Sequence, residues 1–184
     1  MAKNGKSGAG AAGKLVSLER LRTFGDPVLK QPTLLVTEFD DRLEKLAGLM
    51  FDVMEREEGV GLAAPQVGVR SRIMVWHNPD RTSERHVFVN PRILERSDAV
   101  QVQSEGCLSV PGCMVPVERA EEIVIEAQDL AGGEFRMELA GMLARIVQHE
   151  IDHLEGQLIL DRTTADERRK VLKQFRERTL DAES

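Results

Sequence analysis

The sequence has few aromatic residues, only two cysteines and no long apolar run. Aromatic residues make up 4 % of its 184 positions, so aliphatic side chains must fill the core that a hydrophobic content of 41 % allows. No apolar stretch approaches membrane-spanning length and no apolar signal segment opens the chain, which predicts a cytoplasmic protein without a membrane partner. A net charge of −6 argues against a surface built to hold nucleic acid, and we expect no sequence-specific nucleic-acid partner.

Length and composition predict one folded domain that follows a short tail. Residues 1–14 are rich in Gly, Ala and Lys and have no large apolar side chain after the initial methionine, which is typical of a flexible segment. We expect residues 15–184 to form a single catalytic domain that includes a basic C-terminal helix at 164–180.

The spacing of apolar residues predicts an α+β fold. We expect short antiparallel strands and hairpins around a central helix, with one helix before them and one after. The predicted helices are 39–57, 141–154 and 164–180. The predicted strands are 72–76 paired with 86–90, a looser strand at 93–103, and 123–128 paired with 134–139.

The strongest chemical pattern is His-Glu-x-x-His at residues 149–153, within the predicted helix 141–154. Residues four apart lie one turn apart on one helix face, so the imidazoles of His149 and His153 can bind a single cation. Glu150 is adjacent to the first ligand and can reach a water on the metal. Two ligands and one base suit metal-assisted hydrolysis. Two ordinary polar helix histidines are the competing interpretation.

A metal ion needs a third ligand, and four positions can be considered. One zinc-protease class has a third His six residues after the second, but here that residue is Ile159. Another class takes a Glu from a later helix, where Glu177 lies, although a solvated carboxylate is the alternative there. The remaining candidates are Cys107 and Cys113. A disulfide between them is possible, but in a cytoplasmic chain a ligand or catalytic thiol is favoured for at least one.

Three segments occur in a characteristic order and spacing: Gly59–Gln66, Glu105–Ser109 and Gln148–Gly156. Together they resemble the three signature motifs of the peptide deformylases, metalloenzymes that remove the formyl group from the N-terminal methionine of new bacterial proteins. The resemblance implies a metal-dependent hydrolase that acts on N-formylmethionyl nascent peptides and releases formate.

The resemblance also implies a role for particular side chains. The metal ligands that it implies are Cys107, His149 and His153. One divalent ion is expected, with Fe²⁺ as the native metal and Zn²⁺, Ni²⁺ or Co²⁺ as other metals that such a site accepts. Glu150 is implied as the acid and base of the reaction. The backbone N–H of Leu108 and the side-chain amide of Gln66 are implied as donors to the developing oxyanion.

Several neighbours of these residues are expected to shape the site. Candidate walls of a methionine pocket are Val60, Met142 and Ile146, with ordinary core as the alternative. Gly61 would let the backbone approach an extended peptide closely, unless it serves only an ordinary turn. Glu105 is expected to accept a hydrogen bond from an imidazole ligand or to pair with Arg119.

Three positions stand outside this pattern. Many bacterial peptide deformylases carry an Arg seven residues after the motif cysteine, whereas this chain has Met114, so contacts to the substrate backbone are expected to differ. Cys113 is expected to be structural. Asp152 lies on another face of the helix from the ligands and is expected to be a solvated or structural carboxylate rather than a catalytic one.

The C-terminal stretch reverses the charge balance of the chain, with seven basic and three acidic residues from Arg162 to Arg178. In related bacterial enzymes a C-terminal helix docks on the ribosome, and a basic face would suit phosphate contacts. A solvated helix balanced by pairs one turn apart is the alternative. Two other functions compete, a general metallopeptidase and a non-catalytic metal- or ribosome-binding protein. The presence of both Glu150 and Gln66 argues against the second, since binding a metal requires neither.

Overall fold

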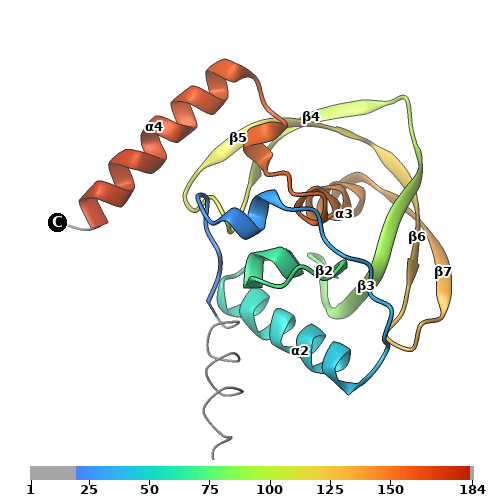
Figure 1. Ribbon diagram of the computed structural model, residues 1–184. Coiled ribbons are helices and arrows are strands. Elements are labelled where there is room, and N and C mark those ends of the chain that lie inside the picture. Colours follow the sequence, from blue (N-terminus) through green and yellow to red (C-terminus); the bar gives the residue numbers. More distant parts are fainter. Residues whose placement is uncertain (1–19, 183–184) are drawn as a thin grey trace, which may run out of the picture.

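Helix α3 (Gly141–Leu154) carries the His-Glu-x-x-His pattern and runs through the interior of the molecule. In this computed structural model, residues 20–182 are described, with side chains as far as residue 177; the predicted tail lies outside that range. Ten of the fourteen residues of α3 are buried, and Figure 1 shows strands curving around it. A helix enclosed in this way brings polar side chains into the core, where each needs a partner.

Two antiparallel sheets surround α3. The larger has the strand order β1-β2-β3-β6-β7, and the smaller pairs β4 with β5. The strands are β1 (Gly61–Ala63), β2 (Ile73–Asn78), β3 (Arg81–Arg96), β4 (Val100–Gly106), β5 (Met114–Ala120), β6 (Glu122–Gln128) and β7 (Glu134–Ala140). Apolar residues of β2, β3, β6 and β7 pack on one side of α3 in a single cluster that includes Met74, Phe88, Ile125 and Val147.

The other helices lie outside this centre. Helix α2 (Asp41–Arg56) begins at Asp40, whose carboxylate accepts hydrogen bonds from the backbone N–H groups of Arg42 and Leu43. Its apolar face packs on β1 and β2. Helix α4 (Ala165–Ala182) projects away from the body in Figure 1. Within residues 20–182 there are also three short 3₁₀ helices: η1 (Pro27–Lys30), η2 (Ala64–Val67) and η3 (Ile159–Asp161). Among the helices of the described range, none is long and apolar enough to cross a membrane.

The predicted α+β class is confirmed, but the middle of the chain differs from the prediction. The expected loose strand at 93–103 is divided, because β3 ends at Arg96 and β4 begins at Val100. Ser97 makes the turn between them: its hydroxyl donates to the carbonyl of Ala99 and accepts from the N–H of Glu122. Strand β5 was not predicted because Pro116 interrupts its pattern, yet an edge strand of a two-stranded sheet tolerates proline.

Asp161 joins three parts of the fold at the end of η3. Its carboxylate caps this short helix by accepting from the N–H of Leu158 at 2.9 Å, and it pairs with Lys30 of η1 and Arg168 of α4. Burial would raise the pKa of Asp161, but the hydrogen bond from Lys30 and the cap outweigh it and hold the pKa below the ordinary 3.8.

We predict that Asp161→Asn lowers the free energy of unfolding at pH 7 by about 1 kcal/mol, because charged hydrogen bonds become neutral ones. A carboxylate with a lowered native pKa stabilises the fold above its unfolded pKa and loses that effect as the pH falls through the native value. The difference between the variant and the parent should therefore shrink below about pH 3.8. Urea unfolding at a series of pH values measures this difference in the free energy of unfolding. A difference that does not change with pH would contradict the assigned role of the Asp161 carboxylate.

Candidate metal centre and active site

The two histidines of the motif meet on one face of α3. Their Nε2 atoms lie 3.2 Å apart, and the side chain of His149 is 12 % exposed while His153 is fully enclosed. Burial, reinforced by the nearby His149, lowers the pKa of His153 well below its usual value. A neutral imidazole keeps the lone pair that a metal ligand requires.

Cys107 completes a group of three donor atoms. It follows directly after β4, and its Sγ lies 3.3 Å from Nε2 of His153. The three donor atoms of Cys107, His149 and His153 all lie within 4.8 Å of one another. A tetrahedral ion at ordinary metal–ligand distances separates two nitrogen ligands by about 3.3 Å and a sulfur from a nitrogen by about 3.5 Å. The three side chains therefore fit one first-row divalent ion and leave one tetrahedral position open.

Glu105, near the end of β4, fixes the orientation of the first imidazole. Its Oε2 accepts from Nδ1 of His149 at 3.0 Å, so Nε2 of that ring faces the other donors. Arg119 of β5 donates to both Glu105 oxygens at 3.0 Å. Burial would raise the pKa of Glu105, but the hydrogen bonds from His149 and Arg119 overcome it and lower the pKa to about 2. Both contacts expected for Glu105 thus exist at once.

Glu150 is buried beside this group but lacks such partners. Burial raises its pKa to about 7, although the neighbouring His149 opposes the rise. Among the described residues, none forms a hydrogen bond with its Oε2. A carboxyl with a pKa near 7 and a free acceptor atom can take up and release a proton at neutral pH.

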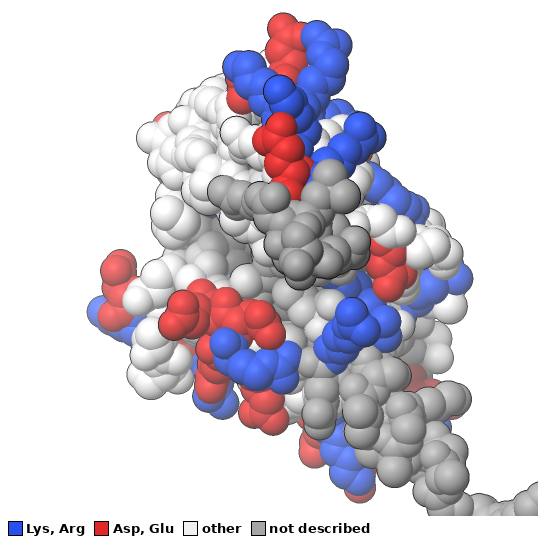
Figure 2. Space-filling view, turned by 90° about the vertical axis from the view of Figure 1, so that its left-hand side faces the viewer, with Lys and Arg blue, Asp and Glu red and all other residues white. Residues whose placement is uncertain are grey.

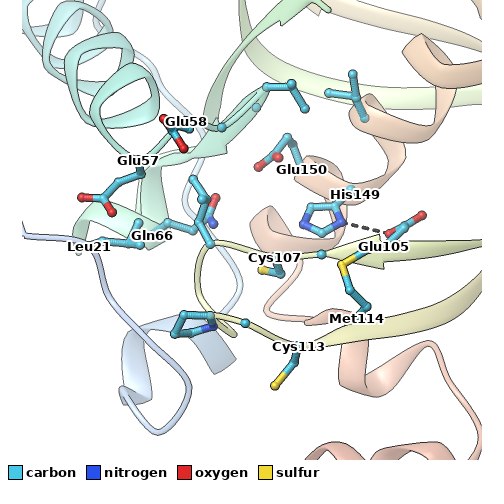
Figure 3. A pocket seen from close by; sticks show the side chains of 18 of the residues that line it. Leu21, Glu57, Glu58, Gln66, Glu105, Cys107, Cys113, Met114, His149 and Glu150 are labelled. Carbon is cyan, nitrogen blue, oxygen red and sulfur yellow. Dashed lines mark hydrogen bonds and ion pairs between the residues drawn. The ribbon is translucent and has the colours of Figure 1, made fainter. Parts of the chain in front are cut away.

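The side chains of Cys107, Glu105, His149 and Glu150 line a cleft of about 1160 Å³. Figure 3 shows Gln66 of η2 and Glu150 of α3 approaching the same space, with Cys107 and His149 beside it. The walls come from the loop after α2, from residues 103–114 and from α3. A concave site with convergent polar groups and shifted pKa values is the expected form of an active site.

Comparison with known proteins agrees with this geometry. The model of the polypeptide deformylase family matches residues 18–169. The chain belongs to this family. It is 47 % identical over 149 residues to the peptide deformylase of Dictyoglomus thermophilum, which covers 81 % of this chain and 95 % of that protein.

Solved structures of peptide deformylases have the same fold. The Legionella pneumophila enzyme superposes with a TM-score of 0.84 at 36 % identity, over 90 % of this chain and 98 % of that one. The Synechococcus elongatus enzyme, solved in complex with actinonin, gives a TM-score of 0.81 at 37 % identity, over 84 % and 86 % of the two chains. Peptide deformylases are metal-dependent hydrolases, which matches the Cys-His-His group.

Within this peptide deformylase fold, the predicted oxyanion donors border the same cleft. Gln66 is 1 % exposed; its Oε1 accepts from the N–H of Ala63 at 2.8 Å, so its Nε2 is the end left to donate. That nitrogen lies 3.3 Å from the hydroxyl of Ser109. Leu108, directly after the cysteine, also lines the cleft.

The predicted pocket residues separate into two kinds. All four, Val60, Gly61, Met142 and Ile146, line the cleft. Met142 is 55 % and Val60 39 % exposed, so for these two the alternative of ordinary core is wrong. Ile146 is 5 % exposed and belongs to both the core and the cleft wall. Met114 is exposed at the cleft rim, where it packs over Gly106.

The alternatives considered for the third ligand lie elsewhere. Ile159 is buried in the core, and the carboxylate of Glu177 pairs with Lys173 on α4. Cys113 is buried and, like Cys107, has a free thiol. Asp152 is structural rather than solvated: it is 5 % exposed and pairs with two arginines. Two charged residues that sequence reasoning missed, Arg145 and Arg162, take part in the same buried network as Glu105.

The structure explains why position 61 is a glycine, in a way that the sequence did not suggest. A Cβ atom added at this position would lie 2.6 Å from Oε1 of Glu150, well inside van der Waals contact. The absence of a side chain in β1 therefore makes room for the Glu150 carboxylate, in addition to any approach of a peptide.

We predict that Gly61→Ala displaces the Glu150 side chain and lowers the free energy of unfolding by about 1–3 kcal/mol, the usual effect of overpacking. Chemical denaturation gives the stability, and a crystal structure of the variant gives the carboxylate position. Gly48→Ala is the matched control, because a Cβ there meets nothing within 4 Å. An unmoved carboxylate with unchanged stability would contradict the steric explanation.

Proposed function

We propose that this protein removes the formyl group from the N-terminal methionine of newly synthesised polypeptides and releases formate. The proposal depends on the convergence of Cys107, His149 and His153, of which Cys107 and His149 line the cleft together with Glu150. Three protein donors and an open position are typical of catalytic rather than structural metal sites. Because the substrate is the start of a new chain, we also propose that the protein works in the cytoplasm.

The metal that we propose is one divalent ion per chain, with Fe²⁺ as the native choice. Zn²⁺, Ni²⁺ and Co²⁺ also suit one thiolate and two imidazoles, so the donor set does not choose among them. When bound, such an ion lowers the pKa of a coordinated water and polarises the formyl carbonyl. Glu105, held by Arg119, fixes the ring of His149 so that its Nε2 would be free to bind such an ion.

The proton transfers are assigned to Glu150. Its carboxylate takes a proton from the attacking water, and the carboxylic acid then gives a proton to the leaving amine. As the formyl carbon becomes tetrahedral, charge grows on its oxygen. We assign the side-chain amide of Gln66 and the backbone N–H of Leu108 as hydrogen-bond donors to that oxygen. Removal of one such donor typically costs about 3–4 kcal/mol of transition-state stabilisation.

The methionine side chain of the substrate is assigned to the apolar part of the cleft. Met142 and Val60 keep exposed surface that an unbranched apolar chain would cover, and Ile146 continues this wall toward the ligands. Met114 stands where many bacterial peptide deformylases have an Arg. The contacts of this side chain to the following residues of the peptide would therefore be apolar.

We predict that Glu150→Gln lowers the rate of formate release from a formyl-Met-Ala-Ser peptide by about 10²–10⁴-fold, while the variant still binds one metal ion. The substitution keeps the shape of the side chain and removes its ability to take a proton. Formate is measured with anaerobically purified protein, and metal content is measured in the same samples. Substantial formate release by a metal-loaded Glu150→Gln variant would contradict the assignment.

We also propose that α4 docks on the ribosome, where nascent chains emerge. The helix projects from the body (Figure 1), and Figure 2 shows basic and acidic side chains mixed at the top of the molecule, where α4 lies. Many of the basic groups have acidic partners, as in the pairs Arg169–Asp166, Lys170–Glu167 and Lys173–Glu177. Those pairs favour modest affinity, since each basic group must exchange a carboxylate for a phosphate.

We predict that the triple variant Arg169→Gln, Lys173→Gln and Arg176→Gln co-sediments with ribosomes several-fold less than the parent. Its binding should also depend less on salt, with the slope reduced by about one for each phosphate that the helix no longer neutralises. The control has the same change in charge on the sheet: Arg81→Gln, Arg92→Gln and Arg136→Gln. Equal sedimentation of the two triple variants would remove α4 as the docking element.

A further inference from the structure

We propose that Arg162 is a positioning residue for the metal centre, and that the C-terminal segment 158–175 braces two of the three ligands. This inference rests on the metal ligation proposed above. It extends that proposal to a part of the chain that does not line the cleft. Two separate sets of contacts carry it, one that leads to His149 and one that leads to Cys107.

The first set begins at the Glu105 carboxylate, whose two oxygens accept hydrogen bonds from three residues. Oε2 accepts from His149 and from Nη2 of Arg119. Oε1 accepts from Nε of Arg119 and, at 2.6 Å, from Nη1 of Arg145. Arg145 is held in turn by the carbonyls of Gln101 and Val117. A carboxylate with four hydrogen bonds has little freedom, so its position is set by its arginines.

The network continues from Arg119 toward the C-terminus. Nη1 of Arg119 donates at 2.5 Å to Oδ2 of Asp152, a residue of α3. Arg162 then holds Asp152 with two hydrogen bonds, from Nη2 to Oδ1 at 2.5 Å and from Nε to Oδ2 at 3.0 Å. Arg119 and Asp152 are at most 7 % exposed, whereas the side chain of Arg162 is 40 % exposed. Arg162 is therefore the point at which this buried network reaches the surface.

The second set of contacts is apolar. Cys107 belongs to a hydrophobic cluster that includes Leu160 of η3 and Leu158, the residue directly before η3. Val171, on the first half of α4, is 3 % exposed and belongs to the same cluster. Phe175 packs its ring against Phe24 at 5.7 Å between centroids. Cys107 thus shares a hydrophobic cluster with side chains of the same segment that holds Asp152 through Arg162.

Removal of the Arg162 guanidinium would leave Asp152 with one arginine where it has two. Asp152 and Glu105 then compete for Arg119, which already donates to both. Any shift of Arg119 moves Glu105 and, through it, the ring of His149. We therefore expect the metal to leave faster without any loss of a ligand. Changes at residues that support metal ligands typically weaken metal affinity about 10- to 100-fold. Arg162 lies three contacts beyond Glu105, through Arg119 and Asp152, so its removal should act less strongly.

The test compares Arg162→Met with Arg168→Met in the full-length chain. Both arginines pair with an aspartate and have similar exposure, 40 % and 42 %, but the partner of Arg168 is Asp161, which lies outside the network. Each protein is loaded with Co²⁺, its visible absorption spectrum is recorded, and release of the ion to a chelator is timed. Arg162→Lys is the conservative variant, and thermal unfolding confirms that each protein is folded.

We expect Arg162→Met to release Co²⁺ about three- to tenfold faster than the parent, with a changed ligand-field spectrum. Arg168→Met should match the parent in both, and Arg162→Lys should recover part of the difference. Identical release rates and spectra for Arg162→Met and Arg168→Met would overturn the inference. A parent that binds no Co²⁺ at Cys107, His149 and His153 would contradict the proposed function instead, and the inference with it.

Discussion

The hydrogen bond between Glu105 and His149 is the contact on which the arrangement of the site depends. It joins β4 to α3, and it connects the ligand set to a group of arginines inside the protein. Charged groups in a core are costly unless each has partners, and the removal of one member leaves the others uncompensated. The two carboxylates of the network, Glu105 and Asp152, each face two arginines. This mutual dependence gives the centre a defined geometry on two separate elements.

The two glutamates of the site have pKa values that are shifted in opposite directions, although burial alone would raise both. Glu105 has arginine and imidazole donors, which outweigh burial and lower its pKa to about 2, so it remains an acceptor at every physiological pH. Glu150 lies on the same helix as His149 without such donors, and burial raises its pKa to about 7. Pairs of titratable groups whose environments move their pKa values apart indicate a division of roles. Here one carboxylate suits orientation and the other suits proton transfer.

Local sequence patterns predicted much of the fold. Helix α3 has the bounds expected from its apolar spacing, and the hairpin of β6 and β7 follows from its glycine turn. Strand β5 could not be predicted, because Pro116 weakens its pattern and because the strand is held by non-local contacts, the pairing with β4 and the packing of Val115 and Val117 in the core. The turn between β3 and β4 is held by non-local hydrogen bonds, among them those of the Ser97 side chain and backbone with Glu122, which a loose alternation of residues does not reveal.

The site was predictable where its residues form motifs and not where they meet through tertiary structure. The resemblance to peptide deformylases identified the Cys-His-His group, which the fold brings within 4.8 Å. Arg145 and Arg162 carry no local signal, because their partners lie 40 and 10 residues away. The close contact between Gly61 and Glu150 likewise joins β1 to α3, so the glycine alone suggested only a turn or a peptide contact.

The proposed activity requires that one thiolate and two imidazoles hold a single divalent ion with an open position. X-ray absorption spectroscopy of the protein loaded with one equivalent of Zn²⁺ or Fe²⁺ measures this directly. We predict one sulfur and two imidazole nitrogens in the ligand shell, with the remaining scatterer an exchangeable oxygen. A shell without sulfur, or one filled by four protein ligands, would contradict the account.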